Sequence, residues 1–151
     1  MDKVAAYLDN LYFLNELEFI LPKSKIDSRD IMFFEKFFKV KLPNTFKNII
    51  LKVNGGIPKP DRVGRIEIDS FISFKKNEQY NVLDVYNNYK HRFKGKIIIP
   101  FAKDSGGNLL VFEYSDYRDF NPSVVFFDHS DWGNPFQKMS NSFEEFIKMF
   151  R

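Results

Sequence analysis

The sequence predicts an α+β fold in which a central antiparallel β-sheet of about four to six strands is flanked by α-helices. Apolar residues recur with a helical period in the N-terminal third and again at the C-terminus, whereas the middle of the chain alternates with a period of two or carries short apolar runs. No repeat and no Ser/Gly linker interrupts the 151 residues, so we expect a single domain over residues 1–151.

The composition is that of a folded globular protein. Hydrophobic residues make up 44% and charged residues 28%, and 19 phenylalanines supply bulk for a core. The absence of cysteine excludes disulfides, thiolate metal sites and cysteine nucleophiles. The N-terminus lacks the pattern of a signal peptide and no apolar stretch is long enough to span a membrane, so we expect a cytoplasmic protein without a membrane partner.

Three helices are predicted before residue 57. A first apolar stripe is formed by Val4, Leu8 and Leu11. A second helix can be capped by Asp27 or Ser28, and its apolar face comprises Ile31, Phe34 and Phe38. A third begins after Leu42-Pro43 and carries Phe46, Ile49, Ile50 and Val53, and we expect Asn54-Gly55-Gly56 to end it with residues of positive φ.

Strands are predicted from residue 65 onwards. Ile66, Ile68, Ile72 and Phe74 alternate with the polar Glu67, Asp69 and Ser73, which indicates a half-buried strand. After a short helix at residues 82–89, apolar runs at residues 97–101, 109–112 and 124–127 are separated by turn sequences, which favours an antiparallel meander.

The C-terminus reads as a last helix. Ser142 and Glu145 have the spacing of a capping box, and Phe143, Phe146, Ile147 and Phe150 form its apolar face. We expect the helices to cover one face of the sheet.

No catalytic, cofactor-binding or metal-binding residue is assigned. Asp104-Ser105-Gly106-Gly107 resembles the nucleophile region of trypsin-like proteases, but the chain is too short for that fold, and a turn between strands accounts for the same residues. His129 beside Asp128 could act as a base or a ligand; the alternative is a histidine that closes a strand. An enzyme and a cofactor are therefore not expected.

Two charged segments are candidates for binding. Lys90, Arg92, Lys94 and Lys96 could contact nucleic acid, although such a cluster without a recognised motif is usually a solvated edge, so nucleic acid is the less favoured partner. Between residues 104 and 131 six acids stand against a single Arg118. Acids and aromatics there suit a basic protein partner, with an ordinary polar turn as the alternative. The predicted partner-binding residues are Glu113, Tyr114, Asp116, Tyr117, Asp119 and Asp131.

The landmarks taken together resemble the SUKH superfamily, the domain of the Smi and Knr regulators of yeast and of many bacterial immunity proteins. A helix-pair motif appears as Ile31, Phe34, Glu35, Leu42-Pro43 and Asn54-Gly55-Gly56, a hairpin signature as Asp104-Ser105-Gly106-Gly107-Asn108, a strand signature as Val124-Val125-Phe126-Phe127-Asp128-His129, and a terminal helix as Ser142-Phe143-Glu144-Glu145-Phe146.

The resemblance implies a non-catalytic domain that binds and neutralises a cognate protein toxin, often a nuclease. A regulatory adaptor, as in the fungal members, is the alternative. The motif residues are expected to be structural: Leu42, Pro43, Asn54, Gly55, Gly56, Asp104, Gly106, Gly107, Asn108, Asp128 and His129.

Overall fold

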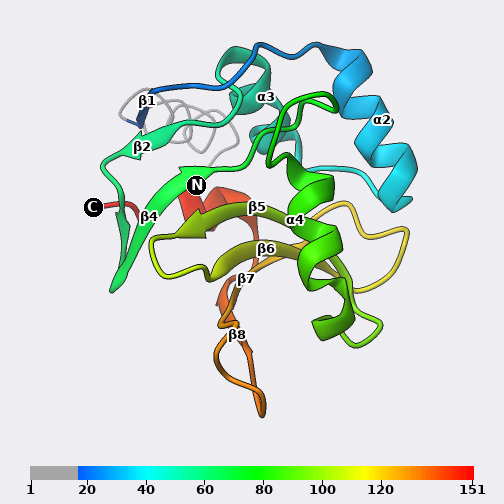
Figure 1. The fold of residues 1–151 in the computed structure, drawn as a ribbon, viewed down its shortest axis with the longest axis vertical. Coiled ribbons are helices and arrows are strands. Elements are labelled where there is room, and N and C mark those ends of the chain that lie inside the picture. The colour runs from blue at the N-terminus through cyan, green and yellow to red at the C-terminus, as the bar shows by residue number, and fades with distance from the viewer. Residues whose placement is uncertain (1–16) are drawn as a thin grey trace, which may run out of the picture.

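The computed structural model describes residues 17–151, and the helix predicted from Val4, Leu8 and Leu11 lies outside them. The α+β fold is confirmed. Six antiparallel strands form a curled sheet in the order β3-β4-β5-β6-β7-β8 (Figure 1). Their bounds are Arg62–Val63, Ile66–Phe71, Ile97–Asp104, Leu109–Tyr114, Ser123–Phe127 and Phe136–Ser140. A separate pair, β1 (Glu18–Ile20) and β2 (Ile57–Lys59), was not predicted.

All four α-helices within residues 17–151 begin where the sequence predicted, and two of them carry a capping box. Helix α2 (Ser28–Phe38) has Asp27 as its N-cap. Asp27 Oδ1 accepts hydrogen bonds from the Arg29 and Asp30 N–H groups, at 2.9 and 3.4 Å, while Asp30 Oδ2 accepts one from the Asp27 N–H. This reciprocal arrangement is a capping box. Helix α4 (Val82–Tyr89) is capped in the same way by Asn81. Both predictions are confirmed.

Helix α3 (Asn44–Lys52) ends differently from the prediction. Its C-cap residue, Val53, has extended backbone with φ of −140°, so the two glycines do not cap the helix. Gly55 and Gly56 do have positive φ, +72° and +93°, but they form the turn that leads into β2. A Cβ on Gly56 would lie 2.8 Å from the carbonyl oxygen of Ile20, so the close approach of β1 also requires glycine.

The predicted alternation in β4 is correct only for its first half. Ile68 faces the core, but the pairing with β5 shifts between Ile68 and Ser70, and the strand ends at Phe71. Residues 71–74 are all buried. Ser73, which the alternation placed on the polar side, is therefore in the interior, where its hydroxyl accepts a hydrogen bond from Asn54.

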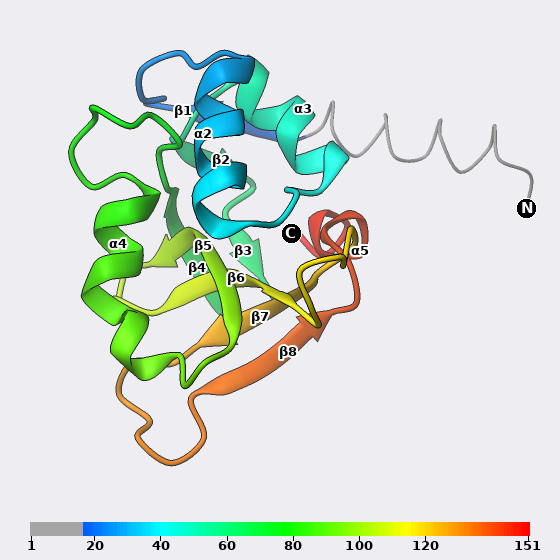
Figure 2. The same cartoon turned by 90° about the vertical axis from the view of Figure 1, so that its right-hand side faces the viewer.

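The helices cover both faces of the sheet, so the expectation of a single covered face is wrong. Helices α2, α3 and α5 (Phe143–Ile147) pack on one face, against a core that includes Ile99, Phe101, Leu110, Phe112 and Val124. Helix α4 and the 3-10 turn η1 (Lys90–Arg92) lie on the other, over Ile98, Leu109, Val111, Val125 and Phe127 (Figure 2). Burial on both faces explains why the central strands read as continuous apolar runs.

Candidate partner-binding surface

The loop between β6 and β7, residues 115–122, is held against the junction between α2 and α3. The hydroxyl of Tyr114 donates a 2.7 Å hydrogen bond to the carbonyl oxygen of Lys41. Burial, and secondarily the neighbouring charges of Glu35 and Asp119, raises the pKa of Tyr114, so the phenol stays neutral. The prediction that Tyr114 is available to a partner is wrong, because its ring is buried in the core.

Two acids organise this loop from within. Asp116 Oδ1 accepts a 2.7 Å hydrogen bond from the Arg118 N–H, and Asp119 accepts from the N–H groups of Ser115 and Asn121. Partial burial alone would raise the pKa of Asp119, but these hydrogen bonds outweigh it and the pKa lies below its usual value. Asp119 is therefore a carboxylate that fixes the loop as well as a surface charge.

The same loop presents two aromatic side chains to solvent. Tyr117 is 61% exposed and Phe120 is 72% exposed. Exposed aromatics on a loop with a fixed backbone lose little conformational entropy on binding, which makes them suitable interface anchors. We call Asp116, Tyr117, Asp119 and Phe120 the loop surface.

The other two predicted partner-binding residues are not on the loop surface. Glu113 is half-buried and forms an ion pair of 3.6 Å with Lys96. Asp131 lies in the β7–β8 loop, at the opposite end of β7, where its carboxylate accepts hydrogen bonds from the N–H groups of Gly133 and Asn134. The single acidic surface expected from the sequence is therefore divided between two ends of the sheet (Figure 2).

The basic segment at residues 90–96 is also divided. Arg92 is buried, and its guanidinium donates hydrogen bonds of 2.8 and 3.0 Å to the carbonyl oxygens of His129 and Asp131. The same group lies 3.6 Å from the ring centroid of Trp132, which is 72% exposed. Arg92 therefore fixes the β7–β8 loop instead of facing a ligand. Trp132 was not among the predicted residues, although it is the only tryptophan of the sequence and stands in a turn sequence, Asp131-Trp132-Gly133-Asn134.

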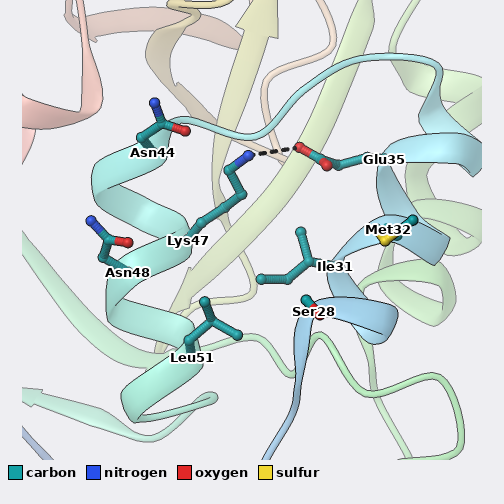
Figure 3. Close-up of a pocket in the computed structure, with 8 residues that line it drawn as sticks. All are labelled: Ser28, Ile31, Met32, Glu35, Asn44, Lys47, Asn48 and Leu51. Carbon is teal, nitrogen blue, oxygen red and sulfur yellow. Dashed lines mark hydrogen bonds and ion pairs between the residues drawn. The ribbon is translucent and has the colours of Figure 1, made fainter.

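The acid of the helix-pair motif ties α2 to α3. Glu35 is only 7% exposed, and its Oε2 accepts a 2.7 Å hydrogen bond from the Leu42 N–H. Lys47 of α3 lies 3.4 Å from the same oxygen, across a hollow between the two helices that Figure 3 shows. A buried carboxylate needs such partners, so Glu35 holds the Leu42-Pro43 junction in place.

Asn54 closes the other end of this helix pair. Its amide donates to the Ser24 carbonyl oxygen at 2.8 Å and to the Ser73 hydroxyl at 2.9 Å, while its Oδ1 accepts from the Phe74 N–H at 2.8 Å. The side chain thus joins three segments that are distant in sequence.

The hairpin and strand signatures form one hydrogen-bonded network. Asp104 Oδ1 accepts from the N–H groups of Gly106 and Asn108, and Asn108 Oδ1 accepts from the His129 N–H. His129 Nε2 lies 2.8 Å from the Gly106 carbonyl oxygen, so this ring nitrogen carries the proton and donates. Gly107 has φ of +87°, which side chains rarely adopt, and a Cβ there would lie 3.3 Å from His129 Nε2, so the ring would have to shift.

Asp128, the remaining acid of the strand signature, stabilises the turn that follows β7. Its carboxylate accepts from the Ser130 hydroxyl and N–H, which keeps the pKa of Asp128 below its usual value. Within residues 17–151 no group of three His, Asp or Glu side chains is arranged to hold a metal ion. No helix among the same residues is long and apolar enough to cross a membrane.

The SMI1 / KNR4 family (SUKH-1) matches residues 25–149, and the chain belongs to this family. A comparison with curated proteins finds no match.

Proposed function

We propose that this chain is a non-catalytic, protein-binding immunity protein that neutralises a toxin acting in the cytoplasm, such as a nuclease. The observation that carries the proposal is the family match over residues 25–149. The motif residues of the chain hold helices and turns together through hydrogen bonds within the chain, which leaves recognition to its exposed loops.

The loop surface is the part of the chain that we propose meets the toxin. Tyr117 and Phe120 would supply the apolar contact area, while Asp116 and Asp119 would face a basic surface such as the substrate groove of a nuclease. Occupation of that groove by the loop excludes the nucleic acid and stops the toxin.

Toxicity rescue tests this function. The product of the gene next to that of the chain is expressed in cells with and without the chain, and complex formation is measured by pull-down. We expect rescue together with a stable complex. Neither rescue nor a complex would reject the immunity function and favour the regulatory adaptor.

Substitutions in the loop test the surface separately from the function. Tyr117→Ser with Phe120→Ser should weaken the complex at least about tenfold, because both side chains are exposed anchors that do not support the fold. The matched control is Leu21→Ser with Tyr80→Ser, two similarly exposed side chains outside the loop. If both double variants bind the toxin with equal affinity, the interface lies elsewhere on the chain.

A further inference from the structure

A groove opens beside the loop surface. It has a volume of about 650 Å³ and lies between the C-terminal end of α2, the α4–η1 segment and the start of β5, with Tyr117 of the loop surface among its lining residues. The groove therefore continues the surface that we propose meets the partner.

The groove is positively charged. Lys39, Lys90 and Lys96 line it together with His91, and no Asp or Glu is among its lining residues. Lys39 and Lys90 form no ion pair with any residue in the described part of the chain, 17–151, whereas Lys96 is paired with Glu113 at 3.6 Å. Two lysines are thus available to a ligand of opposite charge.

Aromatic side chains accompany these lysines. The ring of Tyr86 packs edge-to-face on Phe38, with centroids 5.1 Å apart, and lies 6.4 Å from Phe37, which is 48% exposed. Such rings offer apolar contact next to the charged groups. The groove suits a ligand that combines carboxylates with an apolar or aromatic side chain.

We propose that this groove takes an acidic segment of the protein partner, with an aromatic side chain seated against Phe37 and Tyr117. The inference rests on the proposed protein-binding function and specifies the chemistry of the partner. Tyr117 belongs both to the loop surface and to the lining of the groove, so one partner can contact the two together. Because the loop surface carries acids and the groove carries lysines, a partner with the complementary charges is favoured in one orientation.

A nucleic acid fits the groove less well. Guanidinium groups are the preferred contacts for phosphates and stacked bases, and no arginine lines the groove. Arg92, the arginine of the basic segment, is buried and bonded to two carbonyl oxygens.

The test uses the purified chain and a fluorescein-labelled peptide of glutamates around a pair of phenylalanines. Binding is followed by fluorescence anisotropy at low salt, with a thymidine oligonucleotide of the same net charge as the competing probe. The groove variant is Lys39→Glu with Lys90→Glu. The matched control is Lys52→Glu with Lys138→Glu, which makes the same change in net charge at exposed lysines outside the groove.

We expect the peptide to bind the chain and the control variant alike and to bind the groove variant about tenfold more weakly. Absence of peptide binding, equal loss in both variants, or tighter binding of the oligonucleotide would each overturn the proposal. Because the peptide assay needs no toxin, its failure alongside successful rescue would reject the groove and leave the immunity function standing. If the chain fails to rescue cells from the toxin but the peptide still binds in the groove, the immunity function is rejected and the groove proposal stands.

Discussion

Replacement of Asn54 by alanine tests whether the motif residues serve the fold. The side chain is 2% exposed and makes three hydrogen bonds, to Ser24, Ser73 and Phe74. At about 1 kcal/mol net for each bond, Asn54→Ala should lower the free energy of unfolding by about 3 kcal/mol, and the buried Phe74 N–H left without a partner adds to this loss. That is a large part of the roughly 5 to 15 kcal/mol by which such domains are stable.

Urea unfolding followed by circular dichroism measures this loss. With a slope of about 2 kcal/mol/M, the midpoint should fall by about 1.5 M without a change in slope. Asn48→Ala, at an exposed position on α3, is the matched control and should stay within about 0.5 kcal/mol of the wild type. A midpoint for Asn54→Ala equal to that of the control would refute the reasoning.

Three further results are expected. Gly56→Ala should cost about 2 kcal/mol more than Gly64→Ala in urea unfolding, because both glycines have positive φ but only Gly56 faces backbone within 3 Å; equal losses would contradict this. Arg92→Leu should increase acrylamide quenching of Trp132 fluorescence, since the guanidinium covers one face of the indole, and unchanged quenching would reject that contact. Burial opposes a lowered pKa at Glu78, but hydrogen bonds from the hydroxyl and the N–H of Ser24 help to outweigh it and the pKa is lowered. The stabilisation by Glu78 is therefore present above its unfolded pKa and is lost as the pH falls through the lower folded pKa. Near neutral pH the wild type should therefore melt at a higher temperature than Glu78→Gln, and the difference between the two melting temperatures should shrink as the pH falls. A difference that does not change with pH would argue against this linkage.

Much of the fold follows from local signals in the sequence. The start of α2 was predicted because Asp27 caps its own helix, and the meander because its apolar runs are separated by turn sequences. The short helix at residues 82–89 was also predicted, and Asn81 caps it within the same segment. These features depend on residues that are close in sequence.

The missed features depend on contacts between distant segments. Strand β8 lies at the edge of the sheet and carries exposed Gln137 and Lys138 in succession. Beyond Lys138 its pairing with β7 shifts, so that Val124 pairs with Ser140, and the strand shows no clear alternation. The irregular pairing of β4 hid the burial of Ser73 in the same way. Apolar and polar residues alternate along a strand only where its register with the neighbouring strand is unbroken.

The candidate surface was predicted less completely than the fold. The segment that contains Asp116 and Tyr117 was identified from its composition, but composition does not say that Tyr114 turns inward or that Asp131 lies at the far end of β7. The groove brings together Lys39 and Lys90, which are 51 positions apart. Lys90 stood out as part of the basic segment, but nothing in the sequence connects it with Lys39.

Titration of the purified product of the neighbouring gene with the purified chain tests the immunity function most directly. The toxin's activity on its substrate, for a nuclease the cleavage of nucleic acid, is followed as the chain is added. We predict that activity falls in proportion to the added chain until it is abolished, and that Tyr117→Ser with Phe120→Ser shifts the titration to higher concentration. Full activity in the presence of an excess of the chain would contradict the proposal that it neutralises this toxin.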